Sequence, residues 1–245
     1  MSASPSLSAA LSLDHPNTFS LSAFAEWSRE ALAPHGFVPG NALALLGVCR
    51  DELMFATSRA VSQVWGAAFD VSSLAGMVFL GRSGMAAAAH HAPGLDGRRR
   101  YVVMVLPHIG VTADGTVGMV LREGQHHAST ACGALVGLHA QLAAGTATDT
   151  LDHDDLEMSL LRAEVKTALG DAPVPDLAGL TDVARRCATD EMVRLADGLV
   201  RDADADVAVV SGMVVHHHNE DRVWISEAWV TLRSDGVRIP LGVGA

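Results

Sequence analysis

The sequence predicts an α/β fold with a mainly parallel central sheet flanked by helices and an added C-terminal edge hairpin. Short apolar runs, typical of buried strands, alternate with longer segments whose apolar residues recur at helical spacing, which is the pattern of βαβ units. Hydrophobic residues make up 49% of the 245 residues and charged residues 18%, a globular composition. We therefore expect residues 1–17 to be a flexible N-terminus and residues 18–245 to form a single domain.

Each expected element has a local signal in the sequence. Apolar residues at helical spacing predict helices over 18–34 (with Asn17 as its cap), 51–64, 83–91 and 129–144, and two more between 150 and 200. Apolar and β-branched runs predict strands over 42–48, 71–80, 101–106, 117–121, 206–218 and 222–232. Residues 219–221 indicate a hairpin turn between the last two strands, and we expect this hairpin to pair at the edge of the sheet.

Charge and cysteine content disfavour several classes of protein. The net charge of -11 repels phosphate backbones, so no nucleic-acid partner is expected. No window approaches 18 unbroken apolar residues and the first residues lack a positively charged n-region, so neither a membrane span nor a signal peptide is expected. Three cysteines in such a chain argue against a disulfide framework and predict a reducing cytoplasm, where thiols are free to bind metals.

Three residues are candidate metal ligands. Cys49 and His108 each follow an expected strand, and Cys132 lies near the start of an expected helix. Functional groups of open α/β sheets gather at the carboxyl ends of the strands, so we expect the three to converge on one crevice. Two thiolates and one imidazole suit Zn²⁺ and leave a fourth position open, which is a known catalytic arrangement. From the residues alone, buried structural cysteines and a turn histidine remain open alternatives, because the intervals match no short zinc-finger spacing.

The segments GVCRDE, LPHIGVTADGTVG and ACGAL, in this order, resemble the LCIB (low-CO2-inducible protein B) family. This family is also called the theta class of carbonic anhydrases, and it is similar in fold to the beta class. The resemblance is clearest over residues 35–145. It implies that Zn²⁺ is bound by Cys49, His108 and Cys132, and that a zinc-bound hydroxide converts CO2 reversibly to bicarbonate. It also implies a homodimer, because beta-like anhydrases bury their sites at dimer interfaces.

The resemblance also assigns a role to Asp51, two residues after Cys49. In the beta class this Asp pairs with an Arg, or swings to bind zinc and close the site; in the open site it would orient the hydroxide. The beta class has that Arg two residues after the Asp, where this chain has Leu53. Arg50 and Arg82 are the candidate partners, and we favour Arg82 because a residue next to Asp51 in a helical turn points elsewhere.

Histidines cluster in three further places, His90–His91, His126–His127 and His216–His218. The first pair ends a helix and is a candidate for passing protons at the mouth of the site, since histidine titrates near neutrality. In the second pair, His127 is an alternative to His108 as ligand. We expect the third cluster to lie at the solvated surface, with its middle residue on the opposite face of the strand from its neighbours.

Two rival functions stay open. The first is a catalytically silent zinc-binding scaffold or bicarbonate-handling partner, and the second is a thiol enzyme with Cys49 as nucleophile and His108 as base. The sequence has no P-loop, no Gly-x-Gly-x-x-Gly after a strand and no Ser-centred elbow, which disfavours nucleotide-binding and hydrolase functions. Cys187 has the pattern of a buried helix face, and Asp114 with Gly115 indicates either a turn or a loop that lines the pocket.

Overall fold

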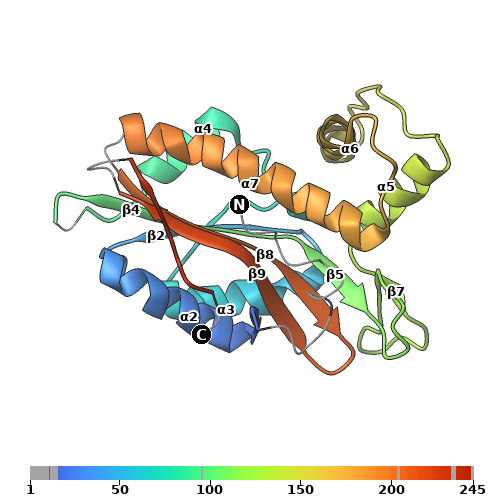
Figure 1. The fold of residues 1–245 in the computed structure, drawn as a ribbon, viewed down its shortest axis with the longest axis horizontal. Helices are drawn as coiled ribbons and strands as arrows, with labels where there is room; N and C mark the ends of the chain where they lie inside the picture. The colour runs from blue at the N-terminus through green and yellow to red at the C-terminus, as the bar shows by residue number, and fades with distance from the viewer. Residues whose placement is uncertain (1–10, 12–15, 95, 203–204, 233–235, 244–245) are drawn as a thin grey trace.

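The computed structural model describes residues 11, 16–94, 96–202, 205–232 and 236–243. These residues form the α/β fold that the sequence predicts, with helices on both faces of a central sheet (Figure 1). Most of residues 1–17 lies outside the described part of the chain, so the flexible N-terminus stays a prediction. None of the described helices is long and apolar enough to cross a membrane.

The central sheet has eight strands within the described residues, in the order β1-β9-β8-β4-β2-β3, with β5 also paired to β8 and β10 to β9. The pairs β2–β3, β2–β4, β4–β8 and β5–β8 are parallel, while β9 is antiparallel to β8, β1 and β10. The strands are β1 (Thr18–Ser20), β2 (Leu43–Val48), β3 (Phe69–Asp70), β4 (Arg99–Leu106), β5 (His108–Val111), β8 (Ala205–His217), β9 (Asp221–Thr231) and β10 (Arg238–Pro240).

The helices form the outer layers. Figure 1 shows α2 and α3 on one face of the sheet and α7 with α4 on the other, while α5 and α6 lie near one end of α7. These helices carry the crossovers between the parallel strands, as a parallel sheet requires. The helices are α2 (Leu21–Leu32), α3 (Phe55–Trp65), α4 (Gly81–Ala89), α5 (Gly133–Ala143), α6 (Leu156–Leu169) and α7 (Leu177–Asp202).

The long strand β8 explains how the sheet reaches the site. Its residues 205–216 are all buried, as expected for a strand covered on both faces. It pairs first with β4 and then with β5, which are separated by Pro107 alone. Pro107 has no N–H to donate, but its carbonyl accepts a hydrogen bond from the Val214 amide at 2.8 Å. The parallel ladder therefore continues past the proline and carries His108 alongside β8.

The C-terminal hairpin forms as predicted, although it is not the outermost part of the sheet. β8 pairs with β4, and β9 lies beyond it, where the described residues that pair with its outer edge are the three-residue strands β1 and β10. The helix predicted over 18–34 begins later, at Leu21, because β1 precedes it and Ser20 caps it in place of Asn17. Asn17 instead accepts a hydrogen bond from the Ile225 amide of β9 through its backbone carbonyl, at 3.0 Å.

The strand predicted over 71–80 is wrong. Only Phe69–Asp70, just before it, pairs with β2 as a strand, and the following chain forms a short 3₁₀ turn at Leu74–Gly76. Gly76 has a φ of +74°, and a Cβ there would lie 2.9 Å from the Cα of Pro107. The segment is apolar because it packs under the end of β4, not because it extends the sheet, and an apolar run alone cannot separate these cases.

Candidate metal centre

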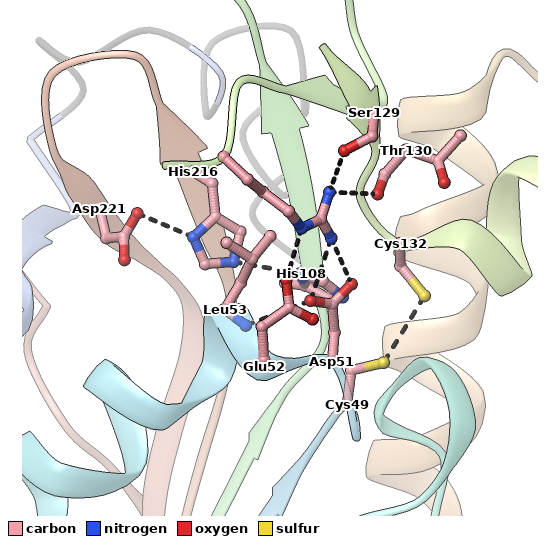
Figure 2. Close-up of polar contacts among 11 residues, drawn as sticks. Cys49, Asp51, Glu52, Leu53, His108, Ser129, Thr130, Cys132, His216 and Asp221 are labelled. Carbon is pink, nitrogen blue, oxygen red and sulfur yellow. Dashed lines mark hydrogen bonds and ion pairs between the residues drawn. The ribbon is translucent and has the colours of Figure 1, made fainter. Parts of the chain in front are cut away.

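The three candidate ligands meet at the carboxyl ends of the central parallel strands. Cys49 directly follows β2, His108 is the first residue of β5, and Cys132 occupies the N-cap position of α5. One ligand atom from each residue lies within 4.8 Å of the others, and all three residues are buried. The two sulfur atoms are 3.6 Å apart (Figure 2). Segments far apart in the sequence thus bring their donor atoms to one point.

A close backbone approach at Gly110 positions Cys132. The Gly110 amide donates a hydrogen bond to the Ala131 carbonyl at 3.0 Å, which ties the residue before Cys132 to β5. On its other side, a Cβ at Gly110 would lie only 2.6 Å from the backbone oxygen of Met119. Any side chain larger than hydrogen would push these segments apart. The glycine two residues after His108 therefore allows the third candidate ligand to reach the first two.

The two cysteines have opposite pKa shifts because their sulfur atoms share a hydrogen bond. This bond lowers the pKa of Cys49 to about 4, and the Asp51 backbone amide adds to the effect. The same hydrogen bond, together with burial, raises the pKa of Cys132 well above its usual value. These opposite shifts favour one thiolate and one thiol within the pair. A divalent metal would find one negative ligand already formed and would displace the remaining proton.

His108 completes a donor set that fits zinc. Its Nε2 atom is fully buried and has no hydrogen-bond partner among the described residues. Leaving such an atom unsatisfied costs about 1–3 kcal/mol, unless a ligand takes the lone pair. Two cysteine sulfurs and one imidazole nitrogen suit Zn²⁺, whereas Mg²⁺ and Ca²⁺ prefer oxygen ligands. The residues present are therefore compatible with a zinc ion held by Cys49, His108 and Cys132.

A carboxylate held by an arginine lies beside this group. Asp51 accepts a hydrogen bond from the Leu53 amide at 3.1 Å, which fixes the turn after Cys49. Nη2 of Arg122 donates to both carboxylate oxygens of Asp51, at 3.2 and 3.1 Å. The Oδ2 atom of Asp51 is 3.8 Å from Nε2 of His108. Asp51 is therefore close enough to contact anything bound between His108 and the cysteines.

Arg122 is itself anchored by the loop that carries Cys132. This loop contains the two-stranded sheet of β6 (Met119–Val120) and β7 (Ser129–Thr130). Nη1 of Arg122 donates to the Ser129 hydroxyl at 2.6 Å and to the Thr130 carbonyl at 3.0 Å. Arg122 also pairs with Glu52, and this hydrogen bond lowers the pKa of Glu52 to about 2. The guanidinium thus links the turn after Cys49 to the segment before Cys132.

Both predicted partners of Asp51 need correction. Arg82 lies exposed in the first turn of α4, and Arg50 pairs with Glu157 of α6 at 2.7 Å. The other carboxylate oxygen of Glu157 accepts from the Leu74 amide at 2.8 Å, so Arg50 is drawn away from the metal centre. Arg122 was missed, although a signal existed. It is the single arginine between His108 and Cys132, in a segment that has to return to the site.

The prediction of a solvated histidine triplet is wrong for His216. This residue is 1% exposed, whereas His217 is half-buried and His218 is exposed. The Nε2 atom of His216 is 3.1 Å from Nδ1 of His108, and its Nδ1 is 2.8 Å from Oδ1 of Asp221 (Figure 2). Sequence reasoning missed both His216 and Asp221. The available signal was their position on either side of the hairpin turn, where cross-strand neighbours meet.

The other two predicted histidine pairs are not part of the metal-binding group found in the described residues. The His91 ring packs against Phe69, whose partner on β2 is Leu45, four residues before Cys49. The ring of His91 thus contacts a side chain of β3, and a proton-passing role for His90 and His91 stays a prediction. His126 and His127 are exposed between β6 and β7, and the metal-binding group found in the described residues contains His108.

Cys187 and Asp114 make contacts that belong to the fold and not to the metal centre. Cys187 is half-buried on α7, and burial raises the pKa of its thiol to about 11, so it stays a thiol. Asp114 lies in an exposed turn, where it accepts hydrogen bonds from Thr112 and Thr116 that lower its pKa. The turn interpretation of Asp114 and Gly115 therefore agrees with the observed contacts.

A cavity of about 250 Å³ lies beside the metal centre, at Cys49 and Asp51. Cys49 and Asp51 line it together with the apolar side chains of Val48, Met54 and Phe55. The Phe55 side chain is 77% exposed and lies at the outer part of this cavity. The cavity is large enough for a small molecule, and its wall is apolar on one side and charged on the other.

The fold and this site define a class: an α/β protein with a buried Cys–His–Cys metal-binding group at the carboxyl ends of its parallel strands. Comparison with known families agrees. Residues 18–233 match the family described as Limiting CO2-inducible proteins B/C beta carbonic anhydrases, and the chain belongs to this family. A search of curated proteins gave no match.

Solved structures of the same family resemble the whole fold. The crystal structure of limiting CO2-inducible protein LCIB superposes with a TM-score of 0.79 at 25% identity, covering 96% of this chain and 98% of that one. The structure of PtLCIB4, a homolog of LCIB, gives a TM-score of 0.75 at 24% identity, with 92% and 95% coverage. The recognition of the family and the α/β fold class predicted from the sequence are thereby confirmed.

Proposed function

We propose that the protein is a zinc-dependent carbonic anhydrase, which converts CO2 and water reversibly to bicarbonate. The observation that carries this proposal is the buried group of Cys49, His108 and Cys132, with Asp51 held beside it by Arg122. Family membership supports the same chemistry. A zinc ion bound by three protein ligands supplies a Lewis acid that makes water nucleophilic near neutral pH.

The residues of the chain would orient the water, bind CO2 and stabilise bicarbonate. The Asp51 carboxylate, fixed by Arg122 and the Leu53 amide, accepts a hydrogen bond from the attacking water and orients its lone pair toward CO2. The apolar side chains of Met54 and Val48 in the neighbouring cavity give CO2 a weakly polar place to bind. The charge of Arg122 also favours the bicarbonate that forms, because it lies at the same edge of the site.

A zinc-binding protein without activity is the principal rival, because Asp51 could itself become the fourth ligand and close the site. The contacts of Arg122 disfavour this closure. Nη2 of Arg122 engages both oxygens of Asp51, and further donors of the guanidinium bind Ser129 and Thr130. Moving Asp51 onto a metal would break a charged hydrogen bond, which is worth about 1.5–3 kcal/mol.

The deciding experiment measures CO2 hydration by stopped flow, with the wild-type protein loaded with zinc and its metal content determined. We expect activity that Cys49→Ala and Cys132→Ala both abolish together with bound zinc, whereas Cys187→Ala retains both. Zinc-replete wild-type protein no faster than the Cys49→Ala variant would refute the enzyme and favour the silent scaffold. Thiol-dependent activity that persists without zinc would favour Cys49 as a nucleophile.

We also infer a homodimer and a cytoplasmic location. Phe55 and Leu121 are large apolar side chains, 77% and 58% exposed, in the segments that carry Asp51 and Arg122, and a second copy would cover such side chains. The two ligand thiols, 3.6 Å apart, need a reducing compartment to stay available for metal. Light scattering should give twice the mass of one chain, and Phe55→Glu should lower it; a wild-type monomer would refute the dimer.

A further inference from the structure

A second histidine and a carboxylate lie behind the candidate ligand His108, on the side away from Asp51. His216 of β8 and Asp221 of β9 are direct cross-strand partners in the hairpin. Gly110 pairs with His216 across the parallel ladder, which brings His108, two residues earlier, next to the His216 ring. The two rings meet edge to face, with centroids 5.1 Å apart and an interplanar angle of 81°. Backbone pairing on both sides of β8 therefore sets this chain of side chains.

The hydrogen-bond directions from His108 through His216 to Asp221 follow from the chemistry of the Asp221 carboxylate. An ionised carboxylate only accepts hydrogen bonds, so Nδ1 of His216 carries a proton and donates a hydrogen bond to Asp221. In the neutral ring Nε2 of His216 is then an acceptor. It can bond to His108, at 3.1 Å, only if Nδ1 of His108 carries the proton. The Nε2 atom of His108 is left with its lone pair facing the cysteines.

The opposite pair of tautomers, with both rings protonated on Nε2, would lose the hydrogen bond to Asp221 and block metal binding by His108. With the proton on Nε2 of His216, its bare Nδ1 would face the Asp221 oxygen at 2.8 Å, lone pair against lone pair. Nδ1 of His108 would become the acceptor, and its Nε2 would carry a proton that blocks coordination. Both rings are almost completely buried, at 0% and 1% exposed, so water cannot compensate for the mismatch.

We propose that His216 and Asp221 are positioning residues, which hold His108 in the one neutral tautomer and orientation that present Nε2 to a metal. This inference rests on the metal centre of the proposed function, and it adds residues that act through His108 rather than by touching substrate. Partners behind a metal-binding histidine commonly fix its tautomer, and their loss typically costs 10–100-fold in metal affinity or activity. Here the partner of the ligand is a second imidazole, and the carboxylate lies one residue further back.

The first test measures zinc affinity by competition with a chelator in matched variants. His216→Leu removes the acceptor, and we expect it to weaken zinc binding roughly 10- to 100-fold. His216→Gln offers a carbonyl oxygen to the Nδ1–H of His108 and should recover most of that loss. His218→Leu is the control, because His218 is exposed at the end of the same hairpin and should bind zinc like the wild type. Thermal unfolding of each variant checks that it folds.

The second test reads the tautomer directly in metal-free wild-type protein. Two-bond ¹H–¹⁵N correlation spectra at about pH 8, where free imidazoles are neutral, should show His108 and His216 both protonated on Nδ1. Asp221→Ala should shift both rings toward the other tautomer. A wild-type His108 protonated on Nε2, a His216→Leu variant with wild-type zinc affinity, or equal losses in the Leu and Gln variants would overturn the inference. The spectra need neither zinc nor activity, so they decide it even if the wild type fails to hydrate CO2.

Discussion

The two sides of the metal centre are built from different interactions. On the outer side, Arg122 joins Asp51 and Glu52 through charged hydrogen bonds, and the Glu52 side chain is 61% exposed. On the inner side, His108 and His216 form a buried chain of ring nitrogens that ends at Asp221. Charged groups near water can exchange partners at modest cost, whereas a buried chain cannot change without leaving a polar atom unsatisfied.

This difference fits a division of labour under the proposed function. The outer side faces the cavity, where reactants and products change during turnover, and there Asp51 is held in place to orient the attacking water. The inner side has one task, which is to keep a ligand nitrogen deprotonated and aimed at the metal. Substitutions on the outer side should therefore change turnover with little effect on metal affinity, and substitutions on the inner side should change metal affinity first.

Arg122→Ala should have the largest effect on turnover. Without the guanidinium, Asp51 is free to move, and we expect kcat/KM for CO2 hydration to fall roughly 10- to 100-fold. Zinc affinity should change much less, because no ligand touches Arg122. Stopped-flow rates and chelator competition on the same samples measure both quantities. Arg122→Lys keeps the charge but not the fork of donors, so it should recover only part of the rate.

An equal loss of zinc and activity in Arg122→Ala would contradict this separation of the two sides. It would mean that the loop of β6 and β7 depends on Arg122 to keep Cys132 in place. The contacts with Ser129 and Thr130 make that outcome measurable, because Ser129→Ala removes one of them while leaving Asp51 paired. A wild-type rate in Arg122→Ala would instead show that turnover does not depend on Arg122 holding Asp51 in place.

The sequence predicted much of the fold because strand patterning is local. Residues 101–106 are an unbroken apolar run rich in valine, and they are buried as a central strand should be. The same rule failed at 71–80, where a largely apolar run packs beneath Pro107 and forms an isolated bridge between Ser73 and Cys49 instead of a strand. Hydrophobicity predicts burial at both places, whereas the positive φ of Ala75 and Gly76 and the close approach of Gly76 to Pro107 distinguish them.

The candidate ligands were predictable because they follow recognisable strands and a helix start. Their partners were not, because each comes from tertiary contacts between distant segments. Arg122 is 71 residues from Asp51, and His216 is 108 residues from His108. The choice of Arg82 failed because a position after an apolar run does not say which way a side chain points. His216 was assigned to the surface because the hairpin turn was visible but the depth of β8 in the sheet was not.

The cysteine pair lies between the two sides and gives the second prediction. The hydrogen bond between the two cysteines lowers the pKa of Cys49 to about 4 and raises that of Cys132, so we expect the pair to hold one proton at neutral pH. Binding zinc above about pH 7, where free imidazoles are neutral, should therefore release about one proton. Zinc affinity should then rise about tenfold per pH unit, and calorimetry in buffers of different ionisation enthalpy counts the protons directly.

Release of two protons would contradict the single shared proton, and it would mean that Cys49 is also a thiol or that the His108–His216 pair holds an extra proton in the metal-free protein. The spectra of the metal-free protein separate these two explanations. Cys187→Ala is the control, because that thiol lies on α7 beside the Glu164 carbonyl and is no part of the group. It should leave the proton count unchanged.

The smallest effect is expected for Arg82→Ala, and it tests whether the outer side has been identified correctly. Arg82 is exposed on α4, so its loss should change the free energy of unfolding by no more than about 0.5 kcal/mol. CO2 hydration and zinc affinity should match the wild type, since Asp51 keeps Arg122. Chemical denaturation and stopped-flow rates measure the two quantities. A loss of activity comparable to that of Arg122→Ala, in a folded and zinc-loaded variant, would show that Asp51 exchanges partners during turnover, with Arg82 as the second one.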